Sequence, residues 1–379
     1  MGVVMAPADD FSDIGQAMEK AVAEGVFPGA VLLWGIQGRI MFHRAFGIVD
    51  LDSGVPVEKD SFFDLASLTK PLATALAMAE LIGKHRLHPH TQLSEVLPET
   101  IGTAKASITM DMLLRHTSGL PAHREYFKRI ARGPAPRSVL RQLLLDEPLE
   151  AEPGKVEVYS DLGYMLLAWV VEKCSGLRLD QFVYGQIYAP LGIDRLFFID
   201  LESGRPLAGA SPGPFIDRSV SILPTSRCPW RKKLIQGEVE DENAWAAGGI
   251  EGHAGLFGDA LSVYRLCCEI MRAVKDETPR VLDPGVVQAF LERGAGRGRV
   301  AGFDTPSGDD SSAGKLFSRA GVGHLGFTGT SLWMDPETGL IVILLTNRVH
   351  PSRENRKIRA FRPLIHDLIS LKNNTNIQV

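Results

Sequence analysis

Hydrophobic positions follow strand-type patterns at both ends of the chain and a helical period in the middle. Turn signals, Gly35-Ile-Gln-Gly38 and Asp335-Pro-Glu-Thr-Gly339, separate pairs of apolar runs. The predicted strands cover residues 29–34, 39–47, 320–327, 331–334 and 340–346. The predicted helices cover residues 11–24, 67–82, 110–114, 138–145, 162–174, 179–188, 261–274 and 353–371, and a Gly/Pro/Ser-rich loop covers 201–229.

This order of elements predicts an α+β fold. A single antiparallel sheet built from both chain termini and flanked by helices explains strands at the two ends, with the helical block inserted as a second lobe. We therefore predict a discontinuous sheet domain over residues 1–75 and 280–379 and a mainly helical domain over residues 76–279. The active site is expected between them.

Composition narrows the function classes. The chain has 379 residues, 45% of them hydrophobic, and a net charge of -4, which offers no electrostatic basis for binding nucleic acid or an anionic membrane. No apolar run reaches the length of a membrane span, and the first residues lack secretory-signal features, so we expect a cytoplasmic protein unless an export signal was removed. The four cysteines show no zinc-type spacing, and neither a metal nor a cofactor is expected. No sequence feature specifies an oligomeric state.

Candidate chemistry begins at Ser67-Leu-Thr-Lys70, followed by Pro71 and a run of strong helix formers. Residues three apart lie on one face of a helix, so Lys70 is expected beside the Ser67 hydroxyl near the helix N-terminus. An adjacent base is what a serine nucleophile requires. A helix-capping serine with a solvated lysine is the alternative reading. A second copy of the pattern, Ser312 to Lys315, lies in a Gly/Ser/Asp-rich stretch and is predicted to be loop.

Two further motifs follow in order, Tyr159-Ser160-Asp161 and His324-Leu325-Gly326-Phe327. Together with Ser67-x-x-Lys70 they resemble the serine hydrolases related to class C β-lactamases, a group that includes DD-peptidases, D-aminopeptidases and family VIII carboxylesterases. The resemblance spans residues 29–348. It is strengthened by Leu114-Arg-His-Thr-Ser-Gly-Leu-Pro121 and by Gly252-His-Ala-Gly-Leu-Phe257.

The resemblance implies a β-lactamase/transpeptidase-like fold and roles for individual residues. Tyr159 would relay the serine proton, and the N–H groups of Ser67 and Phe327 would form the oxyanion hole. Asp161, His324, Gly326 and Arg348 would contact substrate, with Gly326 admitting the substrate backbone. Asp161 stands where many relatives carry Asn, and capping of the following helix by Ser160 or Asp161 is the favoured alternative to a direct role for Asp161. For Arg348 an ordinary surface arginine is an equally good account, and for His253, in a turn that borders the acyl pocket in the family, ordinary packing is the alternative.

The sequence therefore predicts a serine hydrolase that cleaves an ester or amide of a small-molecule or peptide substrate through an acyl-enzyme on Ser67. Neutral Lys70, with a pKa depressed by burial, would accept the proton. His324 and Leu325 replace the Lys and Thr with which relatives bind a β-lactam carboxylate, so esters are expected to be preferred over β-lactams. The alternative is a penicillin-binding-like module that binds or acylates without efficient turnover.

Overall fold

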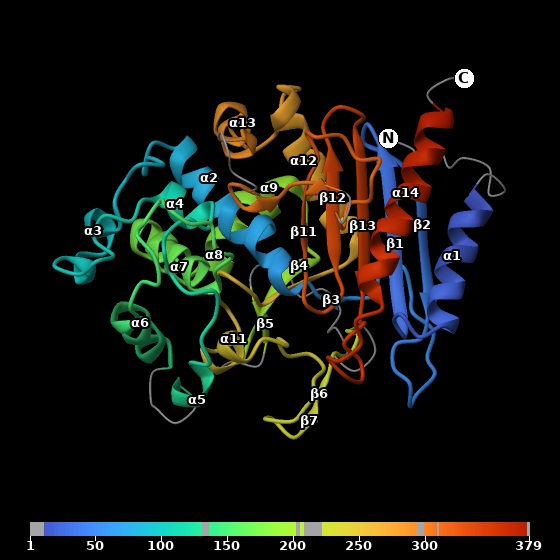
Figure 1. Cartoon of the computed structure of the whole chain (residues 1–379), viewed down its shortest axis with the longest axis horizontal. Helices are drawn as coiled ribbons and strands as arrows, with labels where there is room; N and C mark the ends of the chain where they lie inside the picture. The colour runs from blue at the N-terminus through green and yellow to red at the C-terminus, as the bar shows by residue number, and fades with distance from the viewer. Residues whose placement is uncertain are drawn as a thin grey trace.

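The computed structural model describes residues 11–130, 136–201, 205–207, 222–293, 299–308 and 311–376. Its main element is a seven-stranded antiparallel sheet in which strands from the two ends of the chain are neighbours (Figure 1). The predicted α+β class is confirmed. The strand order is β2 (Arg39–Gly47), β1 (Gly29–Ile36), β13 (Leu340–Thr346), β12 (Ser331–Asp335), β11 (Val322–Leu325), β10 (Phe303–Asp304) and β9 (Arg299–Val300).

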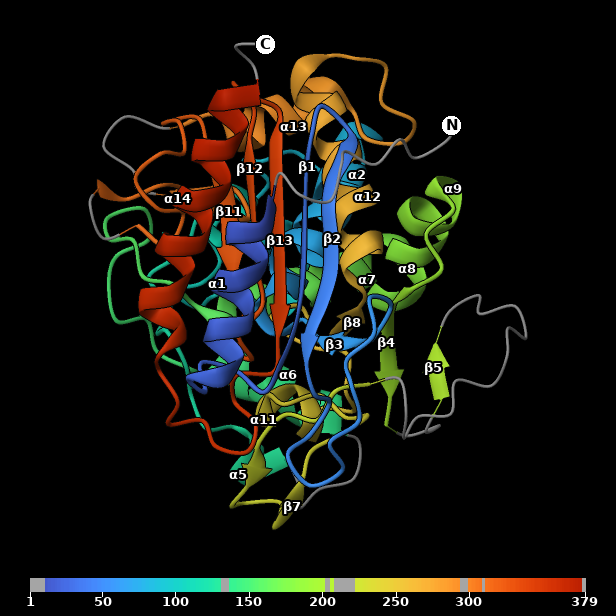
Figure 2. The same cartoon turned by 90° about the vertical axis from the view of Figure 1, so that its right-hand side faces the viewer.

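Both faces of this sheet are covered, which explains why β1 and β13 are almost continuously apolar. Helices α1 (Ser12–Ala23) and α14 (Ile358–Asn376) lie side by side on one face (Figure 2), over the layer that contains Trp34. Helix α12 (Ala260–Lys275) packs on the opposite face, in the layer that contains Leu33. Successive side chains of β1 point to opposite faces of the sheet and therefore contribute to two separate cores.

The chain between the terminal strands is mainly helical, and several of its helices pack around α7 (Asp161–Ser175). A second, four-stranded sheet, which the sequence analysis did not predict, lies beside them in the order β3 (Phe63–Asp64), β8 (Leu256–Gly258), β4 (Leu196–Asp200) and β5 (Arg205–Leu207). A two-stranded hairpin consists of β6 (Arg227–Cys228) and β7 (Lys233–Leu234). The remaining α-helices within the described residues are α2 (Leu76–Gly83), α3 (Leu93–Val96), α4 (Met110–Leu114), α5 (Phe127–Ile130), α6 (Pro136–Asp146), α7 (Asp161–Ser175), α8 (Leu179–Val183), α9 (Ala189–Leu191), α11 (Glu242–Ala246) and α13 (Pro284–Leu291).

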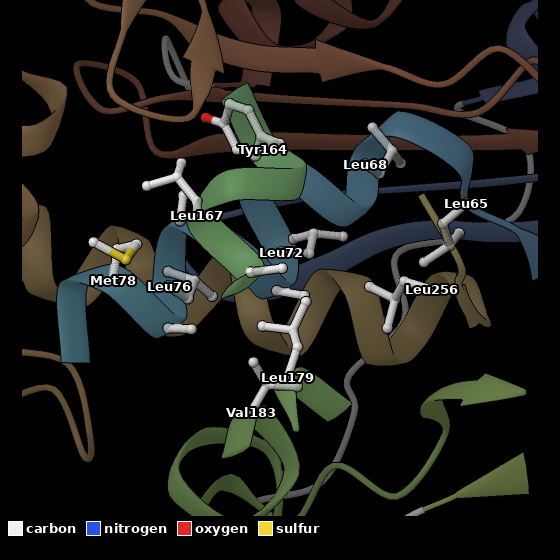
Figure 3. Packing of buried hydrophobic residues seen from close by; sticks show 14 of the residues in the cluster. Leu65, Leu68, Leu72, Leu76, Met78, Tyr164, Leu167, Leu179, Val183 and Leu256 are labelled. Atoms are coloured by element: carbon white, nitrogen blue, oxygen red, sulfur yellow. The ribbon is translucent and has the colours of Figure 1, made fainter. Parts of the chain in front are cut away.

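The segment predicted as one helix over residues 67–82 is helical but not uniform. A 3₁₀ turn (Ala66–Leu68) is followed by a π-helical stretch (Lys70–Ala75) and then by α2. Pro71 lies in the first turn of the π-helical stretch, where the missing N–H removes no helical hydrogen bond. Apolar side chains of this segment pack into the main core against α7 and α8 (Figure 3), so the segment that carries Ser67 is anchored by burial.

Other predicted elements differ in their bounds. The C-terminal helix begins at Ile358 rather than 353, and the predicted helix 179–188 divides into α8 and a π-helical stretch, Tyr184–Tyr188. Ser312 to Lys315 lies in turn structure, as predicted. Most of the predicted loop 201–229 lies outside the described residues. The division into domains at residues 75/76 and 279/280 stays a prediction.

Candidate active site

Ser67 and Lys70 come together as their spacing predicts. The Lys70 Nζ donates to Ser67 Oγ across 3.1 Å, and the Lys70 side chain is fully buried. The turn before them is strained, because Ala66 has a φ of 49°, which a residue with a Cβ adopts at a cost. Asp64 stabilises this turn by accepting the N–H of Ala66 at 2.8 Å.

The charge state of Lys70 differs from the sequence prediction. Its Nζ also donates to Asp161 Oδ1 at 2.8 Å and to the carbonyl of His253 at 3.1 Å, so the three donors of an ammonium have three acceptors. Burial is the largest single effect and lowers the pKa of Lys70, but the charge of Asp161, together with Tyr159 and the hydrogen bonds to both, outweighs it and raises that pKa to about 12. The expectation of a depressed pKa is wrong, because sequence reasoning recognised burial but not the anion.

Asp161 is therefore an ion-pair partner, and Ser160 alone is the helix cap. The Ser160 hydroxyl accepts the N–H of Gly163 at the start of α7 and donates to the Pro121 carbonyl at 2.7 Å. Asp161 turns toward Lys70 instead, and that ammonium, together with hydrogen bonds, overcomes burial and holds the pKa of Asp161 well below its usual range. Sequence analysis favoured a cap for Asp161, which the structure corrects.

Tyr159 lies over Lys70, whose Nζ is 4.7 Å from the centre of the phenol ring. Burial raises the pKa of Tyr159, although Lys70 and Ser67 act in the opposite direction by charge and hydrogen bonding. His116 supports the ring at a centroid distance of 4.7 Å and accepts the N–H of Ser160 through Nδ1. That acceptor role requires neutral imidazole, and burial lowers the pKa of His116 accordingly. Tyr159 is thus a neutral phenol in contact with the Ser67–Lys70 pair.

The β11 strand forms the opposite wall. His324 is buried, its Nδ1–H donates to the Leu325 carbonyl at 2.9 Å, and burial lowers its pKa to about 4. Imidazole at this position is therefore uncharged at neutral pH, as the substitution of Lys by His predicts.

Gly326 is required for a reason that the sequence did not reveal. A Cβ there would lie 2.0 Å from Thr330 Oγ1 and 2.7 Å from the Leu65 carbonyl oxygen. The Thr330 hydroxyl donates to that same carbonyl at 3.0 Å, and the Thr328 hydroxyl donates to the carbonyl of Asp64 at 2.7 Å. The missing side chain thus makes room for the turn that carries Ser67, and its predicted role in admitting substrate stays a prediction.

Phe327 and Arg348 form the rim of the site. The Phe327 side chain is half exposed, and its ring lies under the Arg348 guanidinium at 4.9 Å. Arg348 donates to the carbonyls of Phe327 at 3.0 Å, Arg353 at 3.1 Å and Asn355 at 2.7 Å. The guanidinium therefore holds the backbone around Phe327. Its predicted contact with substrate would have to compete with these bonds.

Three polar residues of the site were not predicted. His123 Nδ1 lies 3.2 Å from Asp161 Oδ2, and His253 Nε2 lies 2.9 Å from Asp241 Oδ1, which gives His253 a polar role that sequence analysis left open. Glu240 accepts from Arg353 at 2.6 Å. No regular spacing in the sequence links these residues. They come together because α7, α11 and the turns around them, which are distant in sequence, pack against one another in the folded protein.

All of the predicted site residues other than Lys70 line one cavity of about 570 Å³, which His123, His253 and the arginines of the C-terminal segment also line. Within the described ranges, no group of His, Cys, Asp and Glu side chains has the arrangement of a metal site. No helix in the same ranges combines the length and apolar character that crossing a bilayer requires.

Comparison with known proteins agrees with this arrangement. The β-lactamase family model matches residues 14–365, which is most of the chain. The chain belongs to the β-lactamase family. It is a serine hydrolase of that family, and the resemblance drawn from its motifs is confirmed.

Similar β-lactamase-family proteins differ in their named activities. A putative D-alanyl-D-alanine carboxypeptidase of Escherichia coli K12 is 28% identical over 88% of this chain and 82% of its own. An N-acetylmuramyl-L-alanine amidase of Bacillus subtilis 168 is 30% identical over 89% of this chain and 80% of its own.

Solved structures show the β-lactamase-like fold. A LovD6 mutant of the simvastatin synthase LovD from Aspergillus terreus has a TM-score of 0.72 at 19% identity, covering 98% of this chain and 99% of its own. EstCE1, a hydrolase with promiscuous acyltransferase activity, has a TM-score of 0.69 at 22% identity, covering 93% of this chain and 98% of its own.

Proposed function

We propose that this protein cleaves ester or amide bonds through an acyl-enzyme on Ser67. The observation that carries the proposal is the contact of the Ser67 hydroxyl with Lys70 Nζ, with Tyr159 packed over the same amine. Ser67 attacks the substrate carbonyl while its proton passes to neutral Lys70 with the Tyr159 phenol as relay, and the proton then returns through Tyr159 to the leaving group. Water subsequently hydrolyses the acyl-enzyme.

The developing oxyanion is assigned to the N–H groups of Ser67 and Phe327. The two threonine hydrogen bonds between the β11–β12 turn and residues 64–65 support this assignment, because they hold the Phe327 turn against the Ser67 turn. Backbone donors held in this way need no reorganisation during the reaction, which is why such sites contribute strongly to catalysis.

We further propose that uncharged esters are better substrates than β-lactams. Neutral His324 and apolar Leu325 supply neither the charge nor the hydroxyl that would bind a β-lactam carboxylate. Each missing charge-assisted hydrogen bond costs about 1.5–3 kcal/mol. An ester without a carboxylate does not depend on these contacts.

A second candidate substrate is an amide-linked peptide that carries a carboxylate. The carboxypeptidase and amidase names of the relatives favour it. Arg356 and Arg359 also line the cavity, and no ion-pair partner for either is present in the described part of the chain. Their guanidinium groups can therefore bind an anionic group of the substrate. Arg348 is less available for this, because it donates to backbone carbonyls.

A substrate panel tests both candidates. We would compare kcat/KM for p-nitrophenyl butyrate, a chromogenic cephalosporin, an acyl-D-alanyl-D-alanine peptide and N-acetylmuramyl-L-alanine. A higher value for the ester than for the cephalosporin supports the ester preference, and the reverse order refutes it. Cleavage of the peptide or the muramyl amide above the ester supports the second candidate. Covalent labelling of Ser67 without turnover of any substrate favours the penicillin-binding-like module.

A further inference from the structure

A continuous line of polar contacts connects the nucleophile to solvent. Ser67 Oγ is 3.1 Å from Lys70 Nζ, Lys70 Nζ is 2.8 Å from Asp161 Oδ1, and Asp161 Oδ2 is 3.2 Å from His123 Nδ1. The Lys70 side chain is fully buried, whereas 46% of the His123 side chain is exposed. Asp161 thus places one carboxylate oxygen on a buried cation and the other on an accessible imidazole.

Lys70 as an ammonium cannot accept the proton of Ser67, and the charge of Asp161 is what retains that proton. The proposed acyl transfer therefore needs a way to weaken the hold of Asp161 on Lys70. Removing the proton to bulk solvent is unfavourable at neutral pH, because burial, the largest single effect on the pKa of Lys70, is outweighed by Asp161 together with Tyr159, and that pKa is raised to about 12. A second cation beside Asp161 would weaken the attraction of its carboxylate for the Lys70 ammonium and would thereby lower the pKa of Lys70.

His123 is placed to become that cation. A carboxylate only accepts hydrogen bonds, so the neutral ring donates Nδ1–H to Asp161 and keeps Nε2 as its basic atom. The charged groups that face the ring are Asp161 at the start of α7 and, at α11, Asp241 and Glu242, with Lys70 behind Asp161. The hydrogen bond to Asp161 and these carboxylates raise the pKa of His123, against a smaller effect of burial.

Building on the proposed function, we propose that His123 is a positioning residue for the base, and that it exchanges one positive charge with Lys70 across Asp161. Lys70 Nζ–H⁺ releases one proton through the Ser67 hydroxyl to water in the cavity, and His123 Nε2 takes one proton from that water, while Asp161 remains a carboxylate. The number of bound protons and the net charge of the site stay constant. Neutral Lys70 then accepts the Ser67 proton, and the bonds that form and break are those of the proposed acyl transfer.

This exchange has a distinctive pH signature. Because the resting and reactive forms hold the same number of protons, kcat/KM should level off for about 1–3 pH units above the pKa of His123, the range over which the imidazolium shifts the Lys70 pKa. At higher pH the form in which both groups are neutral takes over, and the rise resumes. Without the imidazole, neutral Lys70 forms only by losing a proton to solvent, so the logarithm of kcat/KM should rise with unit slope across the neutral range. A charge within about 4–6 Å changes a pKa by about 1–3 units, which predicts a loss of roughly tenfold to a thousandfold at pH 7.

The test is the pH profile of p-nitrophenyl butyrate hydrolysis by the full chain as wild type, His123→Gln and His123→Asn. His90→Gln is the matched control, because His90 is exposed and lies outside the cavity. We expect a plateau in wild type and in the control, a unit slope in both His123 variants, and partial rescue at neutral pH by added imidazole. In an Asp161→Asn background, His123→Gln should cause no further change.

A His123→Gln profile that keeps the wild-type shape and is merely scaled down, without imidazole rescue, would overturn the inference and assign His123 a structural role only. Ser67→Ala separates this failure from that of the proposed function. If Ser67→Ala is inactive and the His123 variants keep the plateau, only the charge exchange is refuted. If Ser67→Ala retains turnover, the acyl-enzyme proposal itself is refuted.

Discussion

Replacing Asp161 by Asn should lower the pKa of Lys70 by several units, because it removes the anion that holds the proton on a buried amine. The Lys70 Nζ to Asp161 Oδ1 distance is 2.8 Å, and only 17% of the Asp161 side chain is exposed. At that distance and an effective dielectric constant of about 20, the attraction is about 6 kcal/mol. That energy corresponds to about 4 pKa units.

The measured change should be smaller than this limit, since the neighbouring dipoles and water respond to the lost charge. Charge pairs in proteins commonly shift a pKa by about 1–3 units. Burial of Lys70 already opposes the ammonium in the wild-type protein, and in Asp161→Asn the attraction of Asp161 no longer offsets it. We therefore expect a decrease of at least 2 units, from about 12 in the wild-type protein.

The assay is a pH titration of lysine labelled with ¹³C at Cε, with the Lys70 resonance assigned by its loss in Lys70→Arg. Wild-type Lys70 should remain an ammonium up to at least pH 10, whereas in Asp161→Asn it should titrate below that pH. Asp241→Asn is the control, because Asp241 contacts His253 rather than Lys70 and should change the Lys70 pKa much less. A Lys70 pKa that is the same in wild type and Asp161→Asn would refute the electrostatic account.

Three further predictions follow from the site. Ser67→Ala should abolish covalent labelling by a fluorophosphonate and lower ester hydrolysis by several orders of magnitude, while Ser312→Ala should change neither. Lys70→Ala and Tyr159→Phe should be strongly non-additive in kcat/KM because they serve one proton transfer, and a double variant that loses the sum of the two single effects would contradict this. Gly326→Ala should lower the free energy of unfolding by about 1–3 kcal/mol, measured by chemical denaturation, because its Cβ would overlap neighbouring atoms.

Local features of the site could be predicted from the sequence, since they depend on spacing along one segment. The contact of Ser67 with Lys70 follows from helical geometry, and the loss of charge at His324 follows from its residue type. The orientation of Asp161 could not be predicted, because it depends on how the start of α7 meets Lys70. The pKa of Lys70 was predicted in the wrong direction for the same reason, because the contact with Asp161 that raises it could not be predicted. His123 reaches the site through a turn, for which no periodicity exists to be recognised.

The same distinction holds for the fold. Long apolar runs such as β1 and β13 are recognisable because both of their faces are buried. Strands β9 and β10 have two residues each, which is too short for any alternation to be recognised. The C-terminal helix begins later than predicted because the segment before it is held by tertiary contacts, in which Arg353 binds Glu240 and Glu242.

The two threonine hydrogen bonds that hold the β11–β12 turn against residues 64–65 also affect when a newly made chain can become active. Thr330 lies 265 residues after the Leu65 carbonyl that it binds, so the Ser67 turn is completed by a segment that leaves the ribosome long after the serine itself. Contacts across such sequence separations form late, because a long loop must first be closed. The nascent protein therefore contains its serine before the arrangement around it is complete, and a working hydrolase exists only after β11, β12 and β13 have joined the N-terminal strands.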